Sequence, residues 1–443
     1  MDGIHTRTTP ALLFCALLVA GCGPPARPVA EVSTAPDQIP AATPISVAPG
    51  DWPWWRGPGR NNVAACESAA TSWSDTQNVL WKAPVPGRGH GSPTVVGPHI
   101  FLCSADEAAE TQNVICLDRA SGKELWSTTI HTGGLPGRGE MHPRSTHANC
   151  SVACDGSALF VAFLNAEHIT ATSLTLDGEI RWQQNLGYFG SKFGYAPSPC
   201  LFESLAIFAA DNSGGGFIAA VHRDSGEIVW RKARNNVDSY SSAITAEING
   251  TTQLLISGDR RVASYDPLSG EENWSCPGTA EATCGTVVWV DNLVFASGGY
   301  PERQTVCVDA NSGTEVWQDR QKCYEQSMLI ANGHLFAVND DGIALCRDAA
   351  TGDLKWRQRL GGSFSASPVL AGNLIYATNE TGTTWVFEAT AEAYREVARN
   401  QLGDESFASL TVCDELIYAR VASGTGADRQ EYLYCLGAPA AQP

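Results

Sequence analysis

The sequence predicts an all-β protein, an eight-bladed β-propeller of four-stranded antiparallel blades. The first observation is a repeated turn: the hexapeptide SGKELW at 121–126 returns in related form, with Gly four positions before Trp each time. The second is a short apolar segment after a turn, which occurs eight times, at 99–102, 158–161, 205–208, 253–256, 292–295, 334–337, 373–376 and 415–418. The repeats follow one another mostly at intervals of about 40–50 residues, and four antiparallel strands in a repeat of that length indicate a propeller blade.

Each repeated turn leads into a Trp that we expect to fill the wedge between neighbouring blades. Gly supplies the positive φ of a tight turn, and an Asp four positions earlier, as at Asp118, Asp266, Asp309 and Asp348, caps it. The structural residues are Trp81, Trp126, Trp182, Trp230, Trp274, Trp317 and Trp356. The seventh blade has lost its Trp, and Val397, inside the expanded turn 389–401, is expected in that place.

The ring is expected to close through the N-terminal strand. Strands nearest the channel open with serines, at Ser92, Ser198, Ser241, Ser242, Ser367 and Ser409. The eighth blade holds three strands, over about 406–436, and the segment NVLWKAPV at 78–85 supplies the fourth. Closure removes unpaired edges from the ring. The propeller therefore spans 76–437, and 438–443 is a short tail.

The N-terminus is predicted to be a targeting segment. Arg7 precedes the apolar run at 11–20, which is too short to span a bilayer and is typical of a signal peptide over 1–21. Residues 19–22, VAGC, resemble the lipobox of bacterial lipoproteins, which makes Cys22 the lipidation site; conventional secretory cleavage nearby is the alternative. The Pro/Ala-rich stretch 22–50 is expected to be an extended tether, and 51–75 a Trp-rich leader packed on the propeller.

The charge of the chain argues against two classes of partner, and its cysteines allow disulfides. The formal net charge of -18 argues against a nucleic-acid surface, and no basic run favours direct membrane binding, so a lipid is the one membrane contact expected. The chain has 15 cysteines, and an exported protein can form disulfides. Cys276 with Cys284 is the first candidate pair and Cys103 with Cys116 the second.

The repeat resembles a known propeller family. CLDRASGKELW at 116–126 and CVDANSGTEVW at 307–317 resemble the tryptophan-docking repeat of quinoprotein dehydrogenases and the wider PQQ-like superfamily. The segment WPWWRGPGRN at 52–61 is similar to the leader of secreted PQQ-like bacterial proteins. The non-enzymatic branch includes the propeller lipoprotein of the outer-membrane β-barrel assembly machinery. The resemblance implies the fold but not the chemistry, because one fold hosts several functions.

No catalytic or metal site is predicted. A quinoprotein alcohol dehydrogenase would carry adjacent cysteines, and the sequence has no Cys-Cys pair; PQQ with Ca²⁺ is therefore disfavoured. His142, His147, Cys150 and Cys154 mimic a zinc ligand set, but the two thiols are expected about 13 Å apart along a strand, which is too far for one metal. No nucleophile elbow, phosphate loop or zinc-protease motif occurs.

The candidate ligand surface is one mouth of the channel. Segments entering the inner strands carry His90, His147, Tyr195, Tyr240, Tyr324, Phe364 and Phe407. These rings either form an aromatic funnel for a ligand or only pack the inner blade edges. The longest connection, 131–147, is the second candidate surface, because long loops on rigid scaffolds often carry function.

The function expected is that of a protein-binding scaffold without a catalytic site. The protein would be an exported, monomeric lipoprotein that faces the periplasm, with the outer membrane favoured, and its partners would be other cell-envelope proteins. Two alternatives remain open: a periplasmic PQQ-dependent oxidoreductase with a divergent site, and a carbohydrate or peptide binder at the central funnel.

Overall fold

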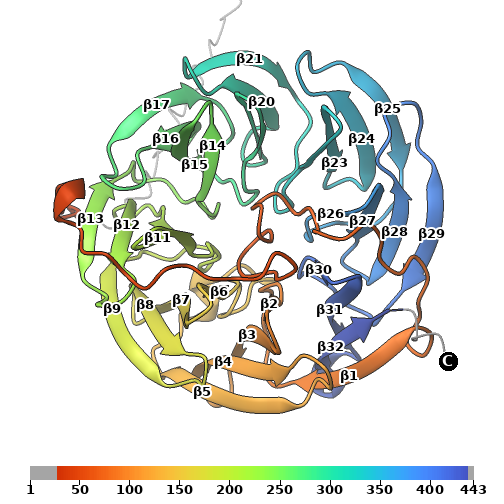
Figure 1. Cartoon of the computed structure of the whole chain (residues 1–443), viewed down its shortest axis with the longest axis horizontal. Coiled ribbons are helices and arrows are strands. Elements are labelled where there is room, and N and C mark those ends of the chain that lie inside the picture. Colours follow the sequence, from red (N-terminus) through yellow and green to blue (C-terminus); the bar gives the residue numbers. More distant parts are fainter. Residues whose placement is uncertain (1–26, 438–443) are drawn as a thin grey trace, which may run out of the picture.

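Eight four-stranded antiparallel sheets close into a ring in the computed structural model, which describes residues 27–437 (Figure 1). The predicted eight-bladed propeller is confirmed. Blades 1 to 4 are β2 (Thr94–Val96), β3 (His99–Asp106), β4 (Thr111–Asp118), β5 (Glu124–Thr132); β6 (Ala153–Cys154), β7 (Ala158–Asn165), β8 (His168–Thr175), β9 (Ile180–Tyr188); β10 (Cys200–Phe202), β11 (Leu205–Ala210), β12 (Phe217–His222), β13 (Ile228–Ala233); and β14 (Ile244–Ile248), β15 (Thr251–Gly258), β16 (Arg261–Tyr265), β17 (Glu272–Pro277).

Blades 5 to 8 follow in ring order. They are β18 (Val288–Val290), β19 (Leu293–Gly298), β20 (Gln304–Asp309), β21 (Thr314–Asp319); β22 (Leu329–Ala331), β23 (His334–Val338), β24 (Ile343–Asp348), β25 (Leu354–Arg359); β26 (Val369–Ala371), β27 (Leu374–Thr378), β28 (Thr383–Glu388), β29 (Glu396–Gln401); and β30 (Thr411–Cys413), β31 (Leu416–Ser423), β32 (Gln430–Leu436), β1 (Val79–Val85). Three 3-10 turns are the only helical elements of residues 27–437: η1 (Pro36–Gln38), η2 (Arg138–Glu140) and η3 (Gly426–Asp428). None of these is long or apolar enough to cross a bilayer.

The N-terminal strand closes the ring as predicted. β1 pairs antiparallel with β32, with Trp81 opposite Cys435 and Val85 opposite Glu431. The last blade therefore joins both ends of the propeller, and its outer strand comes from the beginning of the chain.

Each repeat Trp docks on the turn between the third and fourth strands of the next blade. Trp182 Nε1, for example, donates to Arg223 O (2.9 Å), and Gly226 in that turn has a φ of +77°. Trp81, Trp126, Trp230, Trp317 and Trp356 make the same bond to a turn carbonyl. Trp274 instead donates to the Gln253 side chain (2.9 Å), whose amide donates to Ala310 O in the next turn (3.4 Å). The Trp residues thus link the blades, as predicted.

Every outer strand has a β-bulge at the residue before the Trp position. In blade 1, Cys116 pairs with Trp126 but Leu117 pairs with Glu124, which leaves Leu125 unpaired. A bulge bends a strand and re-aims a side chain. The eight bulge residues are Leu80, Leu125, Arg181, Val229, Asn273, Val316, Lys355 and Val397.

The prediction for Val397 is wrong by one residue. Val386 pairs with Ala398, so Ala398 takes the Trp position and Val397 is the bulge residue. Blade 8 has no turn that could receive a Trp from blade 7, because its outer strand is β1. Trp73 of the leader is buried in the apolar cluster that includes Val386, with Ala398 packed against it, and so occupies that space.

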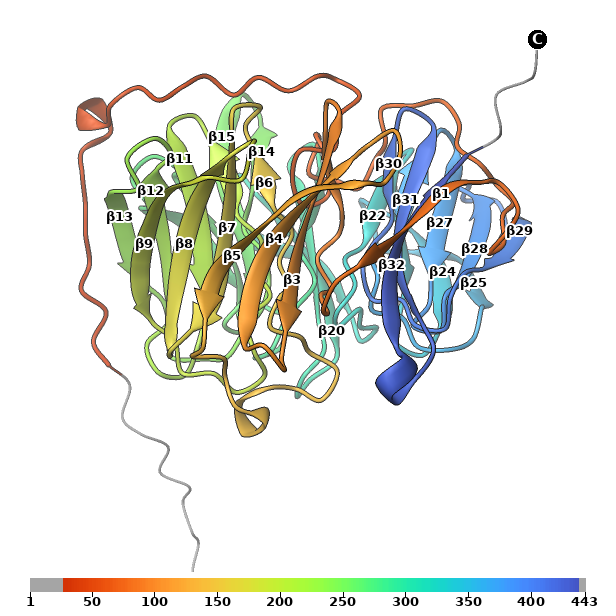
Figure 2. The ribbon, with the colours of Figure 1, turned by 90° about the horizontal axis from the view of Figure 1, so that it is seen from below.

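The segment predicted to be a free tether lies against the propeller. Residues 27–50 run along blade 3 and then across one face of the ring (Figure 2). Val32 forms a backbone bridge with Arg231 on β13, and Thr43 accepts from Arg223, whose guanidinium also binds the buried carboxylate of Asp155. The Pro/Ala-rich composition did not predict this packing. Here the backbone of the tether forms hydrogen bonds with blade 3, and its apolar side chains, such as Ile39, pack against the propeller. Residues 1–26, including Cys22, lie outside the described residues.

Neither predicted disulfide is present among residues 27–437, where all cysteines are thiols. Cys276 is buried in the apolar cluster between blades 4 and 5, whereas Cys284 lines the central channel. In the blade 1 hairpin, Cys103 pairs with Val114 rather than with Cys116, so the register keeps the two thiols apart. Cys103 instead contacts Cys150 of blade 2, with 3.9 Å between the sulfur atoms.

Candidate functional site

A ring of eight hydroxyl side chains, one from each blade, surrounds the channel. It consists of Ser92, Ser151, Ser198, Ser242, Thr286, Ser327, Ser367 and Ser409. At six of the eight steps around the ring, neighbouring inner strands lie so close that the backbone N–H of one ring residue donates to the hydroxyl of the next, at 2.9–3.0 Å. We call these residues the hydroxyl ring. Five of the six serines predicted to open inner strands belong to it: Ser92, Ser198, Ser242, Ser367 and Ser409. The sixth, Ser241, instead donates to the backbone carbonyl of Gly285 (3.1 Å).

The leader enters the channel at one gap in this ring. No bond from Ser242 to Thr286 occurs in the described chain; the Thr286 hydroxyl instead accepts from Trp55 Nε1 (2.9 Å). Two neighbouring leader residues hold Trp55 in place, because Arg56 donates to Met328 O (3.0 Å) and Asn62 to Pro368 O (3.0 Å). Burial lowers the pKa of Arg56 to about 9. The leader thus closes one end of the channel, as Figure 1 shows near the ring centre.

On the other side of Trp55 the channel opens into a cavity of about 500 Å³, which we call the funnel. Its walls include five of the seven predicted rim residues: His90, Tyr195, Tyr240, Tyr324 and Phe407. The His90 and Phe407 rings stack with centroids 4.4 Å apart. Volumes of this size and largely aromatic linings are typical of small-molecule sites.

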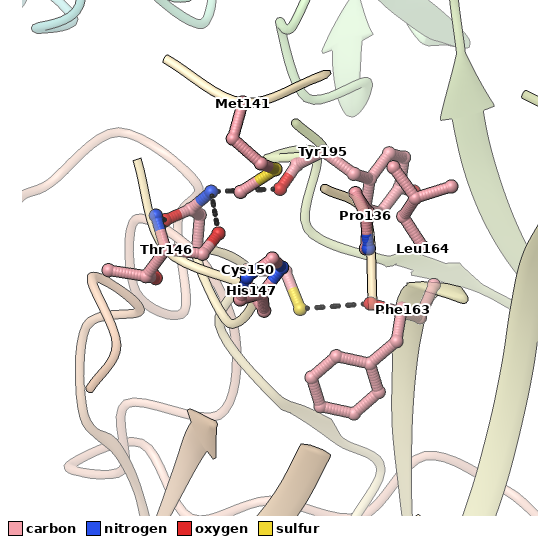
Figure 3. Close-up of a pocket in the computed structure, with 10 residues that line it drawn as sticks. Pro136, Met141, Thr146, His147, Cys150, Phe163, Leu164 and Tyr195 are labelled. Atoms are coloured by element: carbon pink, nitrogen blue, oxygen red, sulfur yellow. Dashed lines mark hydrogen bonds between the residues drawn. The ribbon is translucent and has the colours of Figure 1, made fainter. Parts of the chain in front are cut away.

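Phe364 and His147 are not part of the funnel lining. Phe364 is buried against Trp385 inside blade 7, with ring centroids 5.6 Å apart. His147 lines a separate cavity of about 10 Å³ with Met141, Cys150 and Phe163, shown in Figure 3. That volume holds about one water molecule. Both residues do carry a ring just before an inner strand, as predicted. The sequence does not show whether such a ring points into the channel or into the blade.

Several funnel residues were missed by the sequence analysis. They are Trp55, His142, Arg144, Phe193, Cys284, Tyr300 and Glu325. Trp55 lies in the Trp-rich leader, and His142 and Arg144 lie in the long connection between blades 1 and 2. Both segments had been singled out, but only the tertiary structure shows that they meet in one cavity.

The connection between blades 1 and 2, residues 133–147, crosses the funnel mouth, and we call it the strap. Arg144, near the C-terminal end of the strap, binds Glu325 (3.1 Å) and Glu380 (2.5 Å), which belong to blades 6 and 7 on the far side of the ring. The strap also rests on blade 3, where the Ser191 hydroxyl donates to Glu140 O (2.6 Å). It projects from the face opposite the leader, as Figure 2 shows.

The funnel walls hold polar atoms without a partner. Tyr240 Oη and His90 Nε2 are buried and have no hydrogen-bond partner within residues 27–437. Burial lowers the pKa of His90 well below its ordinary value, and the guanidinium of Arg420 lowers it further, so the imidazole is neutral. Burial raises the pKa of both Tyr240 and Cys284, which keeps the phenol and the thiol protonated.

The zinc-like residues of the strap region do not converge. His142 packs edge-on against Phe193 (5.8 Å), while Cys150 and Cys154 are buried in the apolar cluster between blades 1 and 2. Within the described part of the chain, no three His, Cys, Asp or Glu side chains come together as a metal site.

Comparison with known proteins places this architecture in a family. The family model PQQ_2, described as outer membrane protein assembly factor BamB, matches residues 110–353 and 302–424, which together cover well over half of the chain. The chain belongs to this BamB family. BamB of Moranella endobia (strain PCIT) is 21% identical over 313 residues, which are 69% of this chain and 71% of that protein.

Solved structures show the same fold at low identity. The crystal structure of BamB from Moraxella catarrhalis has a TM-score of 0.58 at 14% identity and covers 82% of this chain and 99% of its own. A europium-containing methanol dehydrogenase has a TM-score of 0.64 at 11% identity, covering 88% and 98%. A quinohemoprotein alcohol dehydrogenase from Comamonas testosteroni has a TM-score of 0.63 at 11% identity, covering 89% and 82%.

The outer rim of this BamB-family propeller is a second candidate surface. Four of its bulge residues are apolar and 45–48% exposed: Leu80, Leu125, Val316 and Val397. Three of these belong to blades 7, 8 and 1, which are neighbours in the ring. Val229 holds the same position in blade 3 but is only 5% exposed, in an apolar cluster that Ile39 of the tether packs against.

Proposed function

We propose that the protein is a cell-envelope scaffold that binds extended segments of partner proteins along the outer strands of blades 7, 8 and 1. The partner segment would add as a strand to β29, β1 or β5 and cover the exposed bulge residue there. Strand addition of this kind supplies affinity through main-chain hydrogen bonds and specificity through side-chain contacts.

The observation that carries this proposal is the docking of the chain's own tether on blade 3. Val32 N donates to Arg231 O (3.1 Å) and Arg231 N donates to Val32 O (2.9 Å), so the tether forms a short antiparallel pair with the outer strand. The Arg231 side chain adds a bond to Ala30 O (2.7 Å). The bridge lies past the bulge, in the regular part of β13. An outer strand of this propeller can therefore accept an extended segment in spite of its bulge.

The exposed apolar side chains indicate which blades remain open to a partner. Three of the four lie on the adjacent blades 7, 8 and 1, whereas Val316 stands alone on blade 5. On blade 3 the bulge residue Val229 is covered, whereas Leu125, Leu80 and Val397 expose nearly half of their surface. Covering these side chains would contribute about 25 cal/mol per Å² of apolar surface removed from water. Blades 2, 4 and 6 have Arg181, Asn273 and Lys355 at this position, and these are not expected to bind an apolar partner.

The envelope location rests on the targeting pattern and on the relatives. The matching family model and the Moranella endobia relative are both named outer membrane protein assembly factor BamB. Lipidation at Cys22 would attach the protein to a membrane, and a monomeric propeller suits a scaffold role. Replacing Cys22 with Ser should release the protein into the soluble fraction after cell lysis; unchanged membrane association would contradict the lipid anchor.

The charge of the funnel supports leaving PQQ out of the proposal. PQQ is a planar tricarboxylate, and Arg144 is the one lysine or arginine among the lining residues, where Glu325 and Glu380 already neutralise it. A Ca²⁺ ion needs several oxygen ligands, and Glu325 is the one carboxylate of the lining. The side chains present do not fit this cofactor, so no step of a redox reaction is derived.

Site-specific photo-crosslinking of the full chain in its own cells tests the docking surface. A photo-reactive amino acid is placed at Leu125 or Val397, and at Arg181 or Lys355 as matched bulge positions in other blades. The proposal expects one envelope protein to be crosslinked from the first two positions and not from the controls. Equal crosslinking at all four positions, or none at the apolar ones, would contradict it.

A further inference from the structure

We propose that the funnel is a binding site for a neutral carbohydrate, with a sugar ring placed between its aromatic walls and above the hydroxyl ring. This activity goes beyond the docking function and uses a different surface. The two can therefore fail independently of each other.

The floor of the funnel presents hydroxyl donors. Ser198, Ser242, Ser367 and Ser409 line the cavity, and each of the four accepts a backbone N–H from the neighbouring blade. A serine hydroxyl has one O–H to donate in addition to its acceptor lone pairs. Within residues 27–437 none of these four O–H groups donates to a protein atom. The floor thus favours a ligand rich in oxygen acceptors.

The walls provide flat apolar surfaces. Tyr240 and Phe193 lie with ring centroids 6.3 Å apart, and His90 stacks on Phe407 on another part of the wall. Trp55 covers the bottom of the cavity. A sugar ring has an apolar C–H face and a rim of hydroxyls, so it can contact an aromatic face and hydrogen-bond at its edge at once. A purely apolar ligand would leave the hydroxyl donors unpaired, which is costly in a buried site.

Two buried polar atoms on the walls point to the same ligand class. Tyr240 Oη and His90 Nε2 face the cavity region without a protein partner. A native protein rarely leaves buried polar atoms unpaired, so a ligand or water is expected to complete them. The tyrosine can donate and the neutral imidazole can donate or accept, and sugar hydroxyls match either role.

The charge of the lining selects a neutral ligand. The one guanidinium of the lining, Arg144, is bound by two carboxylates, Glu325 and Glu380. An anionic ligand would have to displace them, and a cation would find Glu325 already paired. Since a charge taken out of water needs a partner, neither an acidic sugar nor a charged peptide segment is expected to bind as well as an uncharged sugar.

Calorimetric titration of the full chain tests this proposal. The probes are maltose, cellobiose, lactose and N,N′-diacetylchitobiose at millimolar concentrations, with glucose 6-phosphate and a tetra-alanine peptide as charged probes of similar size. Saturable binding of at least one neutral disaccharide, tighter than either charged probe, is the expected result. Absence of binding by all four disaccharides, or tighter binding of a charged probe, overturns the proposal.

Two serine variants provide a matched comparison. Ser242→Ala removes a hydroxyl of the funnel floor, and Ser327→Ala removes an equivalent hydroxyl of the ring that does not line the cavity. Each leaves one backbone N–H without its acceptor, so their effects on folding should be similar. Ser242→Ala is expected to weaken disaccharide binding about 3–10-fold, the effect of one lost hydrogen bond, and Ser327→Ala to leave it unchanged. Equal effects of the two would overturn the assignment.

Thiol protection gives a readout that does not depend on heat of binding. Cys284 is partly exposed and lines the funnel, whereas Cys66 is partly exposed in the leader, outside the funnel. A bound disaccharide should slow the reaction of Cys284 with N-ethylmaleimide and leave that of Cys66 unchanged. Binding without protection of Cys284 would place the ligand elsewhere and overturn the proposal.

Discussion

Trp126 of blade 1 lies directly against Gly178 of blade 2: a Cβ atom on Gly178 would come within 2.7 Å of the indole carbons Cδ2 and Cε3. Trp126 Nε1 donates to Leu176 O in the same turn (2.9 Å). The Gly of the repeat therefore has two roles. It adopts a φ of +87°, and it leaves room for the Trp of the preceding blade.

The first prediction separates these two roles. Gly178→Ala should destabilise the protein by about 1–2 kcal/mol through its left-handed backbone and by about 1–3 kcal/mol more through the clash with Trp126. Gly361→Ala is the matched control, because Gly361 has a φ of +93° and nothing within 4 Å of an added Cβ. Urea unfolding should show the larger loss for Gly178→Ala; equal losses would mean that the contact with Trp126 does not matter.

The second prediction concerns the buried ion pair of Asp155 and Arg223, whose side chains are 0% and 1% exposed. Asp155→Ala leaves a buried guanidinium without its partner and should cost about 3–5 kcal/mol. Arg303→Ala, which breaks the exposed pair with Asp341 (3.4 Å), should cost about 0–1 kcal/mol. Because Arg223 also holds Thr43 of the tether, proteolysis of the tether should be faster in Asp155→Ala. A small loss of stability there would contradict the ion-pair interpretation.

The third prediction concerns how the stability of the folded protein depends on pH. Burial lowers the pKa values of His90, His131 and His147 in the folded state. A depressed folded-state pKa gives stability that is present above the unfolded value of about 6.5 and is lost as the pH falls below it. The melting temperature should therefore fall between about pH 7 and pH 5, and less steeply in His90→Phe. His334→Gln, a surface control, should keep the wild-type slope of melting temperature against pH. If His90→Phe also keeps that slope, buried His90 does not contribute to the pH dependence.

The fourth prediction uses cysteine exposure. Of the thirteen cysteines within residues 27–437, Cys66 and Cys284 alone are partly exposed. Native protein should therefore react with N-ethylmaleimide at these two positions first, and slowly, since burial raises the pKa of both thiols. Peptide mass spectrometry after timed quenching checks this order. Early labelling of Cys276 or Cys103 would contradict the packing described for the blades.

The fifth prediction concerns the strap. Arg144→Gln removes both ion pairs across the funnel mouth, so trypsin should cleave at Arg138 in the strap faster than in the wild-type protein. Arg395→Gln removes two exposed ion pairs on blade 7, with Glu388 and Glu392, and should leave the cleavage rate unchanged. If Arg144→Gln also leaves it unchanged, the strap is held by its contacts with blade 3 rather than by Arg144.

The sequence was sufficient for the fold because the repeat signals are local. The Gly and Trp of each turn fix the third and fourth strands of a blade, and Trp81 identifies the strand that closes the ring. The error at Val397 arose because blade 7 has no Trp to mark the residue that follows the bulge, which the register shows to be Ala398.

The funnel was only partly predictable, because its residues come from segments far apart in the sequence. Tyr195, Tyr240, Tyr324, Phe407 and His90 were found from their place before an inner strand. Trp55 and Arg144 could not be placed, since the leader and the strap reach the channel through tertiary contacts alone. The serines of the inner strands were visible, but their ring of hydrogen bonds exists only after the blades pack side by side.

If Cys22 is lipidated, as proposed, the route of the tether determines how the molecule is oriented at a membrane. Arg27 is the first described residue; its backbone N–H donates to Gly214 O (2.8 Å) and its guanidinium lies over the Tyr188 ring (3.7 Å). In Figure 2 the coloured chain begins on the side of the propeller that bears the strap. From a lipidated Cys22, five residues reach no further than about 18 Å. The bilayer would then face the funnel mouth, and the outer strands of blades 7, 8 and 1 would stand upright beside it, open to proteins approaching in the plane of the membrane.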